Sequence, residues 1–433
     1  MSIEEYFDQK KYIQRVLLEY LEGEWNVEEN YENFIQVLKD HQVFDNYHEL
    51  KELLYLINDI GINHRRTNNF IMKIEQIIEQ MKNDIIHFFK NSEIFKIFKG
   101  NKRLLLFLIE EEIITIDESI TAQITSDEFL EKKYSEYFAP EIKQFITEEF
   151  IEEHSTRNSC LKNKNFINEV KKEQQEDFYD KRKEGENDTF LCELIRTQKT
   201  KDFIAHVNKT YLNLESYIET SIFETNEYLM KDNKKIKIIE YAAFFGSNEI
   251  IRYMHKNGVK LTPNMWFYAI HSADAELIKY LEDNLILPPN NTYEDVLLES
   301  IKSHHNDVSN YIINYLIEEV EKEITNGIKN ESNENLYQCS FEYRNYCFFP
   351  KNIKHKSIFY FLCEFDYCTL VKLYLEHENI DIYATIIQKK SMLKIKFDNL
   401  IMHKVYRKQI HKINDKTLHN ISKKIFFVIR FHI

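Results

Sequence analysis

Apolar side chains recur at helical spacing from the first residues of the chain. In residues 3–22 they fall near a 3.6-residue period, which predicts an amphipathic helix. The positions that share this face are Ile3, Tyr6, Phe7, Ile13, Val16, Leu17 and Leu21. The same spacing predicts further helices over residues 31–38 and 50–60, and we expect Gly61 to end the second of these.

A longer helix is predicted to begin near Asn69. Its apolar residues follow the spacing of a coiled coil, and they are Phe70, Ile74, Ile77, Met81, Ile85 and Phe88. Because this seam is shorter than three heptads, we expect it to pack inside its own domain. A role in self-association is the alternative.

Residues 91–114 are predicted to form a helix pair joined at residues 99–101. Lys99, Lys102 and Arg103 gather at this joint. They lack the G-x-x-x-x-G-K-[ST] frame that would cradle a phosphate, so a solvated helix start is the favoured interpretation. Pro140 is predicted to begin another helix, and the highly charged residues 150–187 are predicted to be a solvated helix or a connector.

Residues 237–260 have the pattern of two short antiparallel helices. Ala242 and Ala243 end the first helix with small side chains that allow close packing, and Gly246 gives the turn a backbone free to take positive φ. Glu249 begins the second helix, and Gly258 follows its end as a C-terminal glycine cap.

The same register recurs along the second half of the chain. Ala242 and Glu249 lie seven residues apart, and the matching pairs are Ile195 with Asp202, Ala269 with Glu276, Ser300 with Asp307, and Leu362 with Thr369. In each unit three positions of the second helix are expected to face the core. They are Phe203, Ile204 and Val207; Ile250, Ile251 and Met254; Leu277, Ile278 and Leu281; Val308, Ser309 and Ile312; Leu370, Val371 and Tyr374.

The units are unevenly spaced along the chain. The interval between Ser300 and Leu362 leaves room for a further divergent unit or an insertion near residues 318–335. Thr262 and Pro263 are predicted to cap and begin the first helix of their unit, and Gly258 has no glycine counterpart in the later units. Trp266 is expected to pack between units.

At these residues the chain resembles the ankyrin-repeat superfamily, and more narrowly a large protist family of ankyrin proteins whose N-terminal half is a helical domain of unknown function. The stretches that carry the resemblance are N-F-I-M-K-I-E, N-S-E-I-F-K-I-F-K-G-N-K-R-L-L-L-F-L-I, C-E-L-I-R, I-E-Y-A-A-F-F-G-S, W-F-Y-A-I-H and S-I-K-S-H-H-N-D-V. The resemblance implies a non-enzymatic fold that binds other proteins.

The predicted fold is therefore all-α, with a helical N-terminal region followed by a divergent ankyrin-type α-solenoid. We expect a helical domain over residues 1–149, a charged connector over 150–187, ankyrin repeats over 188–388 and a basic, poorly ordered tail over 389–433. The residues expected to define the repeats are Ala242, Ala243, Gly246, Glu249, Gly258, Ala269 and Asp307. The candidate partner contacts at repeat tips are Val259, Lys260, Leu261, Pro289 and Asn290.

Composition supports the all-α expectation, since the chain has only 7 Gly and 5 Pro among 433 residues. No signal peptide and no membrane-spanning stretch is predicted. The 6 Cys are too sparse for a disulfide framework, so we expect reduced thiols and an intracellular, cytoplasmic protein.

The net charge of −14 argues against nucleic-acid binding. Residues 389–433 carry twelve Lys and Arg against Asp398 and Asp415, a net charge of +10, which leaves −24 for residues 1–388. We therefore expect basic protein partners for the acidic body. The abrupt reversal of charge leads to the hypothesis that the tail is a truncated or out-of-frame end.

No catalytic residue, cofactor or metal site is predicted. Cys363 and Cys368, with His355 and His377 nearby, are spaced unlike a structural zinc site and are interpreted as buried thiols. His304 and His305 occupy the places of Gly246 and Ser247, and we interpret them as turn residues that bond the neighbouring backbone. The expected function is that of a scaffold or adaptor; a self-associating structural protein is the alternative, and an enzyme is less favoured.

Overall fold

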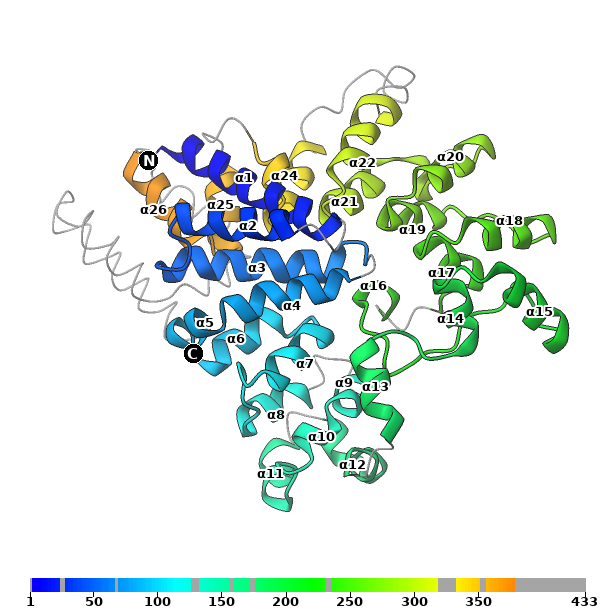
Figure 1. Cartoon of the computed structure of the whole chain (residues 1–433), viewed down its shortest axis with the longest axis horizontal. Helices are drawn as coiled ribbons and strands as arrows, with labels where there is room; N and C mark the ends of the chain where they lie inside the picture. The colour runs from blue at the N-terminus through cyan, green and yellow to red at the C-terminus, as the bar shows by residue number, and fades with distance from the viewer. Residues whose placement is uncertain are drawn as a thin grey trace, which may run out of the picture. The chain divides into compact units, whose positions relative to one another are not determined.

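The computed structural model describes residues 2–23, 28–66, 69–125, 132–155, 159–171, 176–230, 235–317, 332–350 and 356–377 (Figure 1). Within these ranges every regular element is a helix, and an isolated bridge between Tyr217 and Lys237 is the sole β feature. The all-α prediction is confirmed. The predicted basic tail and most of the insertion near residue 318 lie outside the described residues.

Contacts divide the chain into two compact units, Ile3–Lys351 and Asn352–Ile433. The predicted boundaries at residues 150, 188 and 389 stay predictions. Within the described ranges, no helix is long and apolar enough to cross a membrane.

The N-terminal part of the first unit is a layered set of antiparallel helices. They are α1 (Ile3–Glu22), α2 (Glu28–Asp40), α3 (Tyr47–Asn63), α4 (Phe70–Gln80), α5 (Lys82–Phe88), α6 (Asn91–Phe98) and α7 (Lys102–Glu110). Helix α1 packs on α2 and α4, and α3 packs on α4 and α6. All seven apolar residues predicted for the buried face of α1 are buried.

Gly61 does not end α3, contrary to the prediction, because the helix continues to Asn63. A Cβ atom at Gly61 would lie 3.1 Å from both Asn101 Nδ2 and Leu104 Cδ1. The glycine therefore permits the close approach of α7 and does not serve as a helix stop.

The predicted seam of residues 70–88 is interrupted at Met81, which lies between α4 and α5. Phe70, Ile74, Ile77, Met81 and Ile85 are nonetheless all buried. The seam thus packs inside its own unit, as predicted.

The middle of the first unit is built from short helices. They are α8 (Glu118–Ile124), α9 (Lys132–Tyr137), α10 (Ala139–Ile142), α11 (Glu148–His154), the 3₁₀ helix η2 (Ser159–Lys162), α12 (Lys164–Lys171) and α13 (Glu176–Glu184). Pro140 lies in the first turn of α10, as predicted.

The charged stretch after residue 150 is not uniformly solvated, which corrects the prediction. Arg182 of α13 is 3% exposed, and its guanidinium donates two hydrogen bonds of 2.8 Å to the Glu141 carboxylate. Lys102 is likewise fully buried: its Nζ donates to Ile222 O at 3.0 Å and lies 4.9 Å from the centre of the Tyr137 ring. Both cations are buried, contrary to the prediction. Segments distant in the sequence provide the oxygen atoms that accept their hydrogen bonds.

The rest of the first unit consists mainly of helix pairs. The pairs are α14 (Phe190–Arg196) with α15 (Thr200–Thr210), α17 (Ile238–Phe244) with α18 (Asn248–Lys256), α19 (Met265–Ser272) with α20 (Ala275–Asp283), and α21 (Glu294–Lys302) with α22 (Asn306–Tyr311). The π-helix η5 (Ile312–Ile317) continues α22, and α24 (Ser332–Glu342) pairs with the 3₁₀ helix η6 (Tyr346–Phe348). Two short elements, α16 (Glu227–Met230) and η4 (Pro289–Asn291), lie between pairs. The second unit contains one pair, α25 (Lys356–Glu364) and α26 (Cys368–His377).

The two helices of each pair are joined by the same turn, which we call the middle turn. In the pair of α17 and α18, Ser247 N donates to Ala242 O at 2.9 Å and Gly246 has φ +60. The same bond runs from Asp274 to Ala269, from His305 to Ser300, from Asn345 to Ser340 and from Tyr367 to Leu362. The residue before each donor has positive φ, although none is glycine except Gly246; these residues are Ala273, His304, Arg344 and Asp366.

The first pair follows this pattern one residue earlier than predicted. Lys199 N donates to Leu194 O, and Gln198 has φ +54, so Leu194 takes the place assigned to Ile195. Phe203 and Val207 still face the core. One extra residue therefore separates the middle turn from the buried face of α15.

A second recurring turn, the end turn, follows the second helix of three pairs. Val259 N donates to Met254 O, Ile286 N to Leu281 O, and Leu212 N to Val207 O. Gly258, Leu285 and Tyr211 hold the positive-φ position of these turns. Gly258 thus has structural counterparts, which its residue type did not reveal.

The predicted core face of the second helices is confirmed. Thirteen of its fifteen side chains are buried and the other two, Ile204 and Val308, are half-buried. Along the chain α17 contacts α14 and α19, α19 contacts α21, and α21 contacts α24. Trp266 is buried between elements as predicted, and its Nε1 donates to Ile286 O at 2.6 Å.

Thr262 and Pro263 do not begin their helix, contrary to the prediction. Helix α19 starts at Met265, after a turn in which Met265 N donates to Thr262 O and Trp266 N donates to Pro263 O. Pro263 is tolerated in this turn because its missing N–H has no partner to lose there.

Candidate functional site

The second helices α15, α18 and α20 lie along one edge of the first unit (Figure 1). Their apolar residues face the first helices, and α15 contacts α18. Their polar residues therefore form an outward surface that no other described helix covers in the view of Figure 1. This row is a candidate surface for a protein partner.

Polar contacts connect α18 with α20 in this row. Asn248 Nδ2 donates to Asp274 Oδ2 at 2.8 Å, and His255 Nδ1 lies 2.6 Å from Tyr280 Oη. Arg252 pairs with Glu276, and its guanidinium carbon lies 4.8 Å from the centre of the Tyr280 ring. These bonds between pairs fix the spacing of the helices, as a rigid binding surface requires.

Two exposed apolar side chains project from the end turns. Tyr211 is 93% exposed with φ +51, and Leu285 is 87% exposed with φ +53. An L-residue in the left-handed region costs about 1–2 kcal/mol, and an exposed leucine recovers none of this by burial. The positive φ belongs to the recurring end turn, and it is their high exposure that makes these two side chains candidates for contact with another molecule.

The sequence did not indicate Tyr211 or Leu285 as site residues. Each lies four positions after the last core residue of its second helix, where the pair of α17 and α18 has Gly258. Extending the register by those four positions would have aligned both residues with Gly258. Because neither residue is a glycine, residue type alone does not reveal the match.

The first predicted tip is only partly available to a partner. Val259 is 2% exposed and belongs to the core, so its side chain offers a partner almost no surface. Leu261 is half-buried against the same core. Lys260 is exposed, and its backbone N donates to Glu215 Oε1 at 3.3 Å.

The second predicted tip forms the short helix η4. Asn290 is exposed and has φ +61, whereas Pro289 is half-buried. The candidate contacts with a partner protein are therefore this tip, Lys260, and the two exposed residues Tyr211 and Leu285.

The repeat-defining residues occupy three kinds of position, and Gly246 and Gly258 hold the turns already described. Ala242, Ala243 and Ala269 are fully buried in first helices, where small side chains allow the helices to approach. Glu249 and Asp307 are exposed in the first turns of α18 and α22, where an acidic charge favours the helix N-terminus.

A buried polar network joins the N-terminal helices to the last turn of the first unit. Lys10 Nζ lies 2.6 Å from Glu49 Oε2, while Tyr6 Oη and Tyr346 Oη donate to the Glu52 carboxylate at 3.0 and 2.7 Å. A cavity of about 10 Å³ borders Lys10 and Glu52, which is room for a single water molecule. The network contains titratable groups but lacks space for a substrate.

A second buried cluster contains acidic and basic groups. Arg66 Nη1 lies 3.5 Å from Glu186 Oε1 and donates to Thr225 Oγ1 at 2.8 Å. Burial, reinforced by the Glu224 carboxylate, raises the pKa of Glu186 to about 7. Burial also raises the pKa of Glu224.

The two turn histidines reach other elements, which corrects the predicted bonding to the neighbouring backbone. His304 Nδ1 lies 2.9 Å from Gln14 Nε2 in α1. His305 Nε2 donates to His271 O in α19 at 3.0 Å. His305 also lies close to His64 and Glu22, and these three are the residues of the described chain that are arranged to hold a metal ion.

The described thiols are buried to different degrees: Cys192 and Cys339 are buried, whereas Cys363 and Cys368, which were predicted to be buried thiols, are only half-buried. Cys192, Cys339, Cys347, Cys363 and Cys368 are free. Burial raises the pKa of Cys192 to about 11 and that of Cys363 to about 12. The thiol form therefore dominates at neutral pH.

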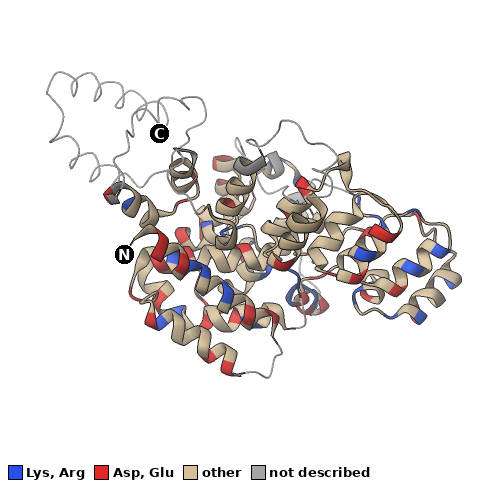
Figure 2. Cartoon of the chain, turned by 90° about the horizontal axis from the view of Figure 1, so that it is seen from above, with Lys and Arg blue, Asp and Glu red and all other residues tan. Residues whose placement is uncertain are grey.

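Charges of both signs are spread over the described helices (Figure 2). Asp and Glu do not gather in one patch in this view, and Lys and Arg lie between them.

No family model matches the chain, and no curated protein or solved structure is significantly similar to it.

Proposed function

We propose that the chain is a non-enzymatic scaffold or adaptor that binds a partner protein with an ankyrin-type α-solenoid. The observation that carries the proposal is the recurrence of one helix pair: the middle-turn bond seen from Ser247 to Ala242 returns in each successive pair of the first unit. Repeated pairs that stack through their first helices create an extended rigid surface, which suits recognition of another protein.

The contact surface is proposed to be the row of α15, α18 and α20 with its end turns. Tyr211 and Leu285 supply exposed apolar contacts, and Lys260 and Asn290 supply polar ones. Tyrosine is enriched among the residues that dominate protein interfaces, because its ring buries much area at small entropic cost.

The self-association alternative is weakened by the packing of the seam. Five of its six residues are buried inside the first unit, so they offer no free face for a second copy. Light scattering after size exclusion separates the two proposals, because a scaffold of this kind is expected to run as a monomer.

The test is affinity purification from the native cell with two surface variants. We expect Tyr211→Ser and Leu285→Ser to weaken capture of the specific partner at least tenfold, because buried anchors contribute about 2 kcal/mol or more. Ile86→Ser is the matched control, since Ile86 is 49% exposed but lies on α5. Equal capture by all three variants would contradict the proposed surface.

The acidic body is proposed to favour a basic partner. Long-range attraction of this kind is screened by salt, so the affinity should fall as ionic strength rises past physiological values. Binding measured at low and high salt checks this, and an unchanged affinity would exclude a mainly electrostatic contribution.

A further inference from the structure

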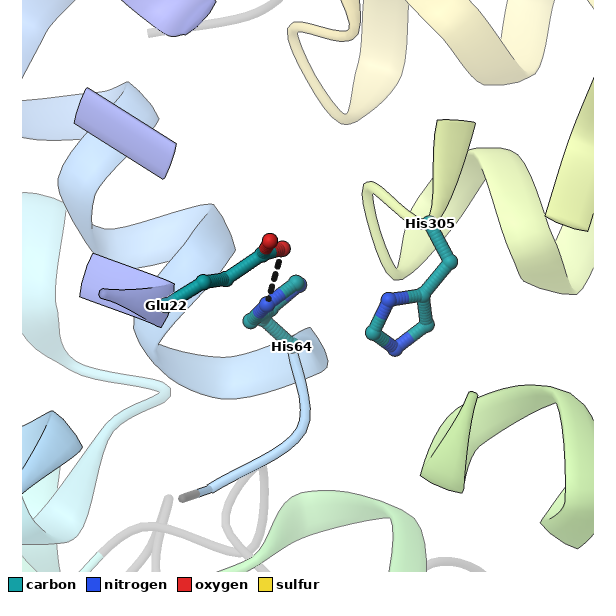
Figure 3. Close-up of side chains that lie close together, drawn as sticks. All are labelled: Glu22, His64 and His305. Carbon is teal, nitrogen blue, oxygen red and sulfur yellow. Dashed lines mark ion pairs between the residues drawn. The ribbon is translucent and has the colours of Figure 1, made fainter. Parts of the chain in front are cut away.

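Three side chains from distant parts of the chain meet inside the first unit (Figure 3). Glu22 is the last residue of α1, His64 follows the end of α3, and His305 precedes α22. One ligand atom from each lies within 4.8 Å of the other two. His64 and His305 are 2% and 7% exposed.

The hydrogen bonds of His64 decide where its proton lies. Nδ1 is 2.7 Å from Ser303 O, and a carbonyl oxygen can only accept, so Nδ1 carries a hydrogen. In the neutral ring Nε2 then has a lone pair, yet it lies 3.1 Å from Glu22 Oε1, which is also an acceptor. Two acceptors at this distance require a hydrogen or a cation between them, which is a second proton on the ring, a proton on the Glu22 carboxyl or a metal ion.

His305 adds a further lone pair to the same place. Its Nε2 donates to His271 O at 3.0 Å, so in the neutral ring Nδ1 is unprotonated and has no bond to another described residue. The ring faces the pair of Glu22 and His64 (Figure 3). A second proton on His64 would leave this lone pair unused, whereas a metal ion would use it.

The surroundings hold the two histidine rings and the end of α1 in position. Each histidine donates its other ring N–H to a backbone carbonyl, the arrangement that orients metal-binding histidines in general. The end of α1 that bears Glu22 is held by Lys73, whose Nζ donates to Tyr20 O at 2.9 Å and Leu21 O at 3.2 Å. The Glu22 side chain itself is 51% exposed, so it can rotate toward an ion.

We propose that Glu22, His64 and His305 bind a divalent first-row transition metal ion such as Zn²⁺. Two imidazole nitrogens and one carboxylate oxygen suit Zn²⁺, with each ligand atom about 2.0–2.2 Å from the metal. The ligand atoms lie within 4.8 Å of one another, so they would have to move closer together to reach that distance from one ion. The fourth position is open to water or to a group from another molecule.

Such an ion would fasten the N-terminal helices to the helix pairs. It would connect the ends of α1 and α3 with the middle turn of the α21 and α22 pair, which lies more than 200 residues further along the chain. The metal would therefore stabilise the folded first unit by binding the native state alone. This role is independent of partner binding at the end turns.

The test is titration of the full chain with Zn²⁺ alone, in competition with a chromophoric chelator, and with Co²⁺ followed by its visible absorption. We expect one tight site, a rise in melting temperature on Zn²⁺ addition and Co²⁺ bands typical of nitrogen and oxygen ligands. Glu22→Gln should weaken binding at least tenfold, and His64→Gln should abolish it. Glu22→Gln keeps the test valid if the histidine variant does not fold, because Glu22 is half exposed.

Matched controls distinguish this site from adventitious binding. Glu19→Gln removes an exposed carboxylate from the same helix, and His87→Gln removes an exposed histidine from α5, so both should bind Zn²⁺ as the unmodified chain does. No tight Zn²⁺ binding by the unmodified chain would overturn the proposal. Equal affinity of Glu22→Gln and Glu19→Gln would also overturn it and assign the ion to other residues.

Discussion

Arg344 and Asp59 form a buried ion pair between the helix pairs and the N-terminal helices. Arg344 Nη1 lies 2.9 Å from Asp59 Oδ2, and the two side chains are 7% and 16% exposed. The guanidinium also stacks on Tyr55 at 4.3 Å. Burial raises the pKa of Asp59 to about 6 even though Arg344 opposes the shift. The pair therefore fixes one specific contact at considerable cost in desolvation.

Removing one member of this pair should destabilise the protein strongly. We expect Arg344→Met to lower the free energy of unfolding by about 3–5 kcal/mol, because it leaves Asp59 buried without its cation. The double variant with Asp59→Leu should recover most of this loss. Urea unfolding measures both changes.

An exposed pair provides the control for this comparison. Lys279 and Asp283 are 69% and 59% exposed, so Lys279→Met should change stability by less than about 1 kcal/mol. A double variant no more stable than Arg344→Met alone would show that the pair is not coupled.

Glu186 should make stability fall as the pH rises. Its pKa is raised to about 7 in the folded state, mainly by burial and then by Glu224, against an ordinary value of 4.5. Between these pH values the folded state binds more protons than the unfolded state, so the free energy of unfolding decreases with increasing pH. We expect Glu186→Gln to flatten this decrease between pH 5 and pH 8.

The measurement for Glu186 is chemical unfolding at several pH values. Glu193→Gln is the control, because Glu193 is about half exposed and should leave the pH dependence unchanged. Identical pH profiles for the unmodified chain and Glu186→Gln would contradict the assignment.

At the residue level the sequence predicted correctly which apolar side chains are buried, but it did not predict which charged side chains are buried. The apolar residues of α1 were identified by their spacing alone, since period 3.6 determines which side chains share a face. Lys102 and Arg182 were expected to be solvated, because the carbonyl and carboxylate that accept their hydrogen bonds come from segments 120 and 41 residues away. Spacing within one helix contains no information on such partners.

At the level of elements, the middle turn is the feature that repeats most closely. Its bond recurs after Leu194, Ala242, Ala269, Ser300, Ser340 and Leu362. A glycine marks the positive-φ position in one of these turns, so residue type reveals the turn only there. The pair of α24 and η6 was missed for this reason, although the sequence left room for an additional unit at that place.

The two glycines of the pair of α17 and α18 should differ in their tolerance of substitution. A Cβ atom at Gly246 would lie 2.9 Å from Asp274 Oδ2, whereas a Cβ at Gly258 meets nothing within 4 Å. Both glycines have positive φ, so alanine at either position costs about 1–2 kcal/mol in backbone strain.

We therefore expect Gly246→Ala to destabilise more than Gly258→Ala, since it adds a steric conflict with the Asp274 carboxylate, which also accepts from Asn248. Thermal unfolding of the two variants compares them directly. Equal losses of stability in the two variants would show that the pair of α19 and α20 moves to make room for the added methyl group at no cost in free energy.

At the scale of the whole chain, the N-terminal helices contact the helix pairs through the last two middle turns of the first unit. Gln14 Nε2 lies 2.9 Å from His304 Nδ1 and donates to Asn345 Oδ1 at 3.0 Å, and His64 Nδ1 lies 2.7 Å from Ser303 O. These contacts span 239 to 331 residues. The composition predicted an all-α fold, but no local pattern could predict contacts at such separations. The metal site depends on them.

Partner contact at the end turns is tested most directly by photo-crosslinking in the native cell. A photoreactive residue is placed at position 211, 285 or 86 in otherwise unmodified chains. We expect positions 211 and 285 to crosslink to one and the same protein, because both lie on the proposed surface, while position 86 on α5 should not. Adducts equally abundant from all three positions, or none from 211 and 285, would contradict a scaffold that binds through this surface.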